Sequence, residues 1–153
     1  MPTPIMTSTR ALLSFVVAVA AVGVAAGCGG NEASSATVPL FEQGGSGQSG
    51  TATFTSQGST TRVEIALSNS PAIPQPSHIH QGTCENPNPQ PAFPLDDVVG
   101  GTAETTVNAS LEELQGDEDY YVNVHKSATE LETIVACGNL PDSSGGGYGG
   151  GGY

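Results

Sequence analysis

The chain has 153 residues, of which 37% are hydrophobic, so it has room for one domain with a small core. Fifteen acidic residues stand against three basic ones, and the formal net charge at pH 7 is −12. A surface this acidic repels phosphate groups, which argues against a nucleic-acid partner.

The N-terminus carries Arg10 and then the apolar run ALLSFVVAVAAVGVAA. This run is shorter than the roughly 20 residues that span a bilayer and ends in small residues, the layout of a secretory signal peptide. The AAGC sequence at its end resembles the lipobox of bacterial lipoproteins, in which the cysteine is acylated and becomes the first mature residue. We therefore expect a signal peptide over residues 1–27 and a lipid on Cys28 that anchors the protein on the outer face of the cytoplasmic membrane. The alternative is ordinary secretion without a lipid.

Two segments poor in core-forming residues flank the remaining chain. Residues 28–37 are small and polar and predict a flexible tether, and residues 143–153, SSGGGYGGGGY, predict a disordered Gly/Tyr-rich tail. We expect the folded domain to occupy residues 38–142.

Within this domain, apolar and polar residues alternate in short runs, the pattern of half-buried strands. The runs we assign to strands are residues 51–55, 62–67, 77–81, 103–109, 120–125 and 131–137. The one helical candidate is SLEEL at residues 110–114, where Ser110 can cap the turn. Short strands with Gly- and Pro-rich turns between them predict an antiparallel β-sandwich or flattened barrel.

Residues 85–95, ENPNPQPAFPL, contain four prolines. Proline fixes φ and removes a backbone donor, so we expect this segment to be a semi-rigid loop outside the sheets. A second proline-rich piece, residues 70–76, leads directly into the strand SHIHQ.

That strand and a later one hold all three histidines of the chain. Residues i and i+2 of a strand share a face, so His78 and His80 point together while Ile79 points to the core. In YYVNVH, His125 shares a face with Tyr121 and Asn123, opposite the apolar residues. We expect the three imidazoles to converge from two neighbouring strands.

Three neutral imidazoles suit copper(II) in a tetragonal arrangement, or zinc in a tetrahedral one with water as the fourth ligand. The alternative is that these are ordinary, partly exposed histidines with surface hydrogen bonds. Glu85, Asp96 and Asp97 lie near the predicted site in the sequence. One of these carboxylates could supply a fourth ligand, or all three are solvated loop charges.

The sequence also gives a prediction for the cysteines. If Cys28 is lipidated, Cys84 and Cys137 remain as an even pair in an oxidising compartment, and we expect them to form a disulfide.

Several of these motifs together resemble a known family. SHIHQGTC resembles the His-x-His and following Gly-x-Cys region of copper,zinc superoxide dismutases, VNVH resembles their late copper-ligand strand, and VACGNL resembles the segment that holds their second disulfide cysteine. The same pieces, with GTATFT early and DDVVGGTAETTV in the middle, also resemble the CHRD domain, to which YYVNVH is the closer match. The resemblance covers about residues 50–140.

The resemblance implies an all-β fold, an eight-stranded antiparallel Greek-key β-sandwich, with one disulfide between Cys84 and Cys137. It also implies that His78, His80 and His125 are copper ligands.

The sequence departs from the dismutases in ways that bear on function. The loop after Cys84 contains no histidine, so the resemblance implies that the zinc site is absent. Ile134 stands where that family has its anion-guiding arginine, and Lys126 is the only positive charge near His125.

Three functions remain open at this point. The first is a lipid-anchored copper-binding module that stores or presents copper at the cell surface. The second is a copper-only superoxide dismutase, in which the open position of a three-histidine site binds superoxide. The third is a metal-free structural or adhesive surface domain. The sequence names no protein partner.

Overall fold

The computed structural model describes residues 33–143, which form eight strands and one short helix. The predicted signal peptide, Cys28 and nearly all of the predicted tail lie outside the described residues. Over residues 33–143, no helix is long and apolar enough to cross a membrane. The elements are β1 (Ser35–Glu42), β2 (Ser49–Ser56), β3 (Thr61–Ser68), β4 (Gln75–Gly82), β5 (Pro87–Val98), β6 (Thr102–Val107), α1 (Leu111–Leu114), β7 (Tyr120–His125) and β8 (Ile134–Asn139).

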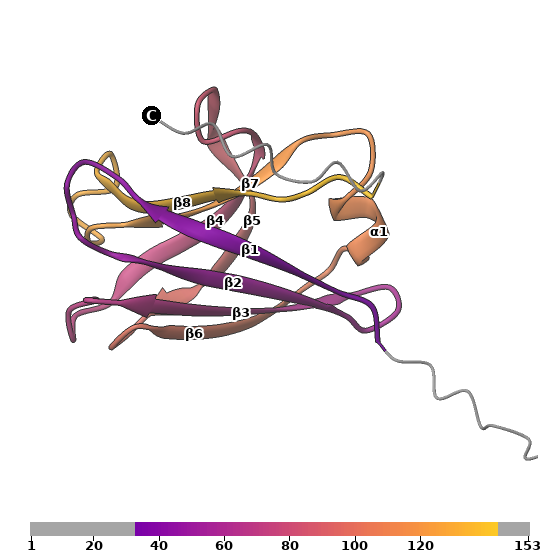
Figure 1. The fold of residues 1–153 in the computed structure, drawn as a ribbon, viewed down its shortest axis with the longest axis horizontal. Helices are drawn as coiled ribbons and strands as arrows, with labels where there is room; N and C mark the ends of the chain where they lie inside the picture. Colours follow the sequence, from indigo (N-terminus) through magenta and orange to yellow (C-terminus); the bar gives the residue numbers. More distant parts are fainter. Residues whose placement is uncertain (1–32, 144–153) are drawn as a thin grey trace, which may run out of the picture. The chain divides into compact units, whose positions relative to one another are not determined.

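The eight strands form one antiparallel sheet in the order β5-β4-β7-β8-β1-β2-β3-β6. Figure 1 shows β1, β2, β3 and β6 running side by side, with β4 and β5 behind them. The sheet curves until its two end strands, β5 and β6, come into contact, so the fold is nearly a barrel. The all-β antiparallel class predicted from the sequence is confirmed.

The core lies inside this curved sheet, and most strands contribute every second residue to it. Val38 and Leu40 of β1 and Ala52 and Phe54 of β2 are at most 1% exposed. Alternate positions point to opposite faces of a strand, so these period-two residues meet in the interior. Two of the strands were not predicted, β1 and β5, and β1 begins three residues inside the segment assigned to the tether.

The proline-rich segment 85–95 was predicted to be a loop, and that prediction is wrong. Most of it belongs to β5, which pairs with β4 through an irregular register. An end strand leaves one row of backbone groups outside the ladder, so it tolerates residues that lack an N–H. Pro87, Pro89 and Pro91 occupy every second position of this edge strand. The register shifts between β4 and β5 accommodate positions at which a proline cannot donate a ladder hydrogen bond.

The predicted cap is confirmed. The side chain of Ser110 accepts a hydrogen bond of 3.1 Å from the backbone N–H of Glu113, which satisfies one of the free donors at the start of α1. Leu111 and Leu114 of this turn are buried in the core. The turn therefore closes one end of the barrel with apolar side chains.

The disulfide between Cys84 and Cys137 is also present. Cys84 lies just after β4 and Cys137 lies within β8, so the bond ties the β4–β5 turn to the sheet. The backbone N–H of Cys84 donates a 2.7 Å hydrogen bond to the Asn139 side chain, which in turn donates to Glu85 over 3.0 Å. These contacts fix the start of β5 against β8.

We expect loss of this disulfide to be costly. The bond closes a loop with a sequence separation of 53 residues, for which chain entropy gives about 4 kcal/mol. A Cys84→Ser, Cys137→Ser variant should lose about that much free energy of unfolding in urea titrations. Wild-type protein under a reductant is the control, and its free energy of unfolding should equal that of the variant. If the reduced wild type and the variant each lose less than about 1 kcal/mol of this free energy, the expectation is contradicted.

Candidate metal centre

β7 is the central strand of the histidine-bearing half of the sheet. It lies between β4 and β8, and all six of its residues are buried. Val122 and Val124 face the core, as predicted. The opposite face, with Tyr121, Asn123 and His125, is buried as well, and residues of β5 and of the β7–β8 connection line the pocket above it.

The register between β4 and β7 brings the histidines together. His78 lies opposite Asn123, and His80 lies opposite Tyr121. Ile79, between the two histidines, is fully buried in the core, as the alternation predicted. His80 is 3% and His125 7% exposed. The alternative of partly exposed surface histidines therefore fails for these two residues.

The three imidazoles converge on one point. One ring nitrogen of each histidine lies within 4.8 Å of the ring nitrogens that the other two offer. Nε2 of His125 is 3.1 Å from Nδ1 of His78, and the rings of His78 and His80 meet edge to face with centroids 5.5 Å apart. The sequence prediction that two strands bring these residues together is confirmed.

The tautomer of His80 follows from its surroundings. Nδ1 lies 2.8 Å from the backbone carbonyl of Asn88, and a carbonyl only accepts, so Nδ1 carries the proton. Nε2 is then left with a lone pair, and this atom is buried without a hydrogen-bond partner. Metal-ligating histidines commonly donate their other N–H to a carbonyl in this way, which fixes the ring and the ligand atom.

Two residues that the sequence did not single out hold His80 in place. The Tyr121 ring stacks on the His80 ring with centroids 5.0 Å apart, and its hydroxyl donates to the same Asn88 carbonyl over 3.1 Å. Asn88 stands between Pro87 and Pro89, and a residue before proline is restricted to extended backbone. The prolines thus fix the direction of the carbonyl that orients His80.

His78 and His125 favour their neutral forms. Burial lowers the pKa of His78, and the charges of His125 and His80 lower it further, against a smaller opposite effect of Asp97. Burial also lowers the pKa of His125, opposed by the backbone of Leu131. Neutral imidazoles keep the lone pairs that a metal needs.

The histidines form the floor of an open pocket of about 450 Å³. Its walls come from two segments: Pro87, Pro89 and Pro91 of β5 on one side, and Leu131, Glu132 and Ile134 around the β7–β8 connection on the other. The pocket therefore opens to solvent above the three histidines, while Nε2 of His80 itself is buried.

No carboxylate joins the three histidines as a close ligand within residues 33–143. Glu85 accepts a hydrogen bond from the Asn139 side chain, which lowers the pKa of Glu85. Lys126, the positive charge next to His125, is exposed and pairs with Glu130 at 2.7 Å.

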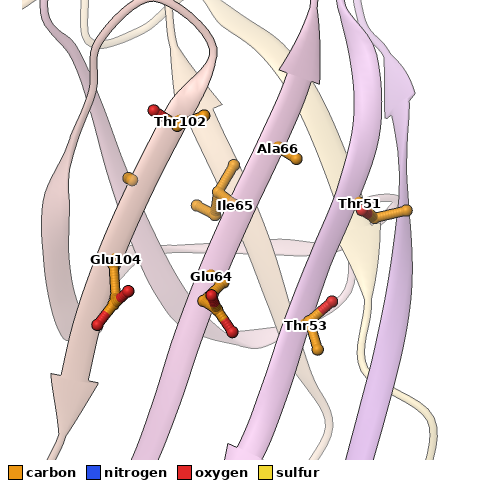
Figure 2. Close-up of a pocket in the computed structure, with 8 residues that line it drawn as sticks. Thr51, Thr53, Glu64, Ile65, Ala66, Thr102 and Glu104 are labelled. Carbon is orange, nitrogen blue, oxygen red and sulfur yellow. The ribbon is translucent and has the colours of Figure 1, made fainter.

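A larger hollow of about 650 Å³ lies over β2, β3 and β6, and it lacks comparable chemistry. Figure 2 shows threonines around two carboxylates, Glu64 and Glu104. Both carboxylates accept hydrogen bonds from Arg62, at 2.7 and 2.9 Å. No histidine or cysteine lines this hollow, so the histidine pocket remains the candidate site.

Comparisons with known proteins do not assign a family. No family model matches the chain. A search of curated proteins also finds no match.

We expect the free energy of unfolding of the metal-free protein to fall below about pH 6.5, the ordinary histidine pKa. Because the pKa values of His78 and His125 are lowered by folding, the unfolded chain takes up protons that the folded protein does not. The free energy of unfolding continues to fall until the pH is below the lowered pKa values of the two histidines. Urea titrations with a chelator between pH 5 and pH 8 measure this pH dependence for the wild type and for a His78→Gln, His125→Gln variant. If the free energy of unfolding changes equally with pH in the two proteins, the prediction is contradicted.

Proposed function

We propose that this protein is a copper-binding module whose ligands are His78, His80 and His125. The observation that carries the proposal is the buried, unpartnered Nε2 of His80, directed by the Asn88 carbonyl to a place where two other imidazoles converge. A buried polar atom without a partner is costly. A metal ion bonded to this nitrogen would satisfy it.

The donor set fits copper. Nδ1 of His78 and Nε2 of His125 are 3.1 Å apart, a separation that two imidazole nitrogens bonded to one ion at about 2.0–2.1 Å also have. Three imidazoles suit copper and zinc alike, and copper binds more tightly than zinc to the same nitrogen ligands. Bound copper would supply a redox-active centre with an open coordination position facing the pocket.

The strand order supports a CHRD or superoxide dismutase-like fold. The pairings of β3 with β6, β4 with β7 and β8 with β1 join strands that are not adjacent in the sequence. Such crossovers are typical of Greek-key sandwiches. In this proposal, β1, β2, β3 and β6 form one layer and β5, β4, β7 and β8 the other.

The pocket favours binding over superoxide dismutation. Ile134, at the position of the dismutases' anion-guiding arginine, lines the pocket, and Lys126 is engaged with Glu130. The formal net charge of −12 further discourages an approaching anion. We therefore propose that the protein stores or presents copper, held on the outer face of the cytoplasmic membrane by a lipid on Cys28.

Metal content and copper EPR on the full chain in mild detergent test this proposal. We expect one copper per chain with nitrogen couplings, and loss of both in a His78→Ala, His80→Ala, His125→Ala variant. Glu64→Gln, in the hollow without histidines, is the matched control and should bind one copper. Far-UV circular dichroism checks that each variant is folded.

A folded wild-type protein that binds no copper would overturn the proposal, as would a triple variant that binds copper with unchanged couplings. A superoxide assay on the loaded protein then separates storage from catalysis. We expect no dismutation above the rate given by the triple variant.

A further inference from the structure

Above the three imidazoles, the walls of the histidine pocket carry apolar side chains. Pro89, Pro91 and the ring of Tyr121 form one side, and Leu131 and Ile134 form the other. Leu131 is 48% exposed, which leaves an apolar side chain at the mouth that a bound molecule would cover. Ligand pockets typically combine such apolar walls with a few polar groups.

Besides the histidines, two oxygen acceptors belong to residues that line this pocket. Glu132 brings a carboxylate, and Oδ1 of Asn123 is buried without a hydrogen-bond partner. Both groups repel a negatively charged ligand.

No basic side chain among the described residues is available to offset this repulsion. Arg62 lies on β3 and binds Glu64 and Glu104, and Lys126 binds Glu130. Neither residue lines the pocket. A bound copper ion would itself attract an anion, and the oxygen acceptors of the pocket and the acidic surface of the protein would oppose that attraction.

We infer that the open position of the copper site takes a small, uncharged aromatic molecule with a nitrogen or oxygen donor atom, rather than an anion. The donor atom binds the metal, and the ring lies between the proline and tyrosine wall and the side chains of Leu131 and Ile134. This inference rests on the proposed copper site and adds the class of ligand that the site selects.

Titration of the copper-loaded full chain with three probes tests the inference. Imidazole and 4-phenylimidazole offer the same donor nitrogen and differ by one apolar ring, and azide is a small anion. Copper EPR and visible spectra report ligand exchange at the metal. We expect 4-phenylimidazole to bind at least about tenfold more tightly than imidazole, because the added ring is removed from water.

Two variants locate the effect. Ile134→Ser removes part of the apolar wall without touching a copper ligand, and should reduce the preference for 4-phenylimidazole to about threefold or less. Glu132→Lys reverses the charge at the pocket and should strengthen azide binding several-fold, with little change for imidazole. With copper(I), the methyl resonances of Leu131 and Ile134 should shift when 4-phenylimidazole is added.

The outcomes separate the two proposals. A protein that loads copper but binds both imidazoles equally, or binds azide more tightly than 4-phenylimidazole, overturns the ligand class and leaves the copper site intact. A preference for 4-phenylimidazole that is unchanged in Ile134→Ser also overturns it, because the ring would then lie elsewhere. A protein that does not load copper overturns both proposals.

Discussion

The pairing of β4 with β7 is the constraint on which the site depends. Its register places His78 and His80 opposite Asn123 and Tyr121, two residues that share a face with His125. A slip of one residue would turn every side chain of a strand to the other face. The buried Ile79, Val122 and Val124 prevent that slip, because it would remove them from the apolar core and put polar side chains in their place. The apolar core thus fixes the geometry of the polar site on the far face of the same strands.

The proline-rich β5 completes the site from the edge of the sheet. It covers the histidine face, supplies the Asn88 carbonyl and forms a wall of the pocket. The disulfide and the Asn139 contacts hold its beginning against β8. Burial then has two effects on the histidines: it lowers the pKa of His78 and of His125, and it leaves Nε2 of His80 without a solvent partner. The lowered pKa values of His78 and His125 favour a bound metal over a proton, and a metal ion would satisfy Nε2 of His80.

Much of this site follows from local sequence patterns. The i, i+2 alternation in SHIHQ and YYVNVH was sufficient to place the three histidines on one side of the sheet, because strand periodicity is a local property. The place of β5 could not be predicted in the same way. Proline content indicates a loop, and only the position at the sheet edge, a property of the whole fold, makes a strand possible there. The roles of Asn88 and of its carbonyl were missed for the same reason.

The central claim is that one copper ion binds to the three histidines, and crystals of the copper-loaded protein test it most directly. Anomalous diffraction at the copper absorption edge locates the ion without assumptions about its ligands. The account predicts one peak within bonding distance of Nδ1 of His78, Nε2 of His80 and Nε2 of His125, with an open side facing the pocket. A peak at carboxylates elsewhere on the surface, with the histidines unliganded, would contradict it.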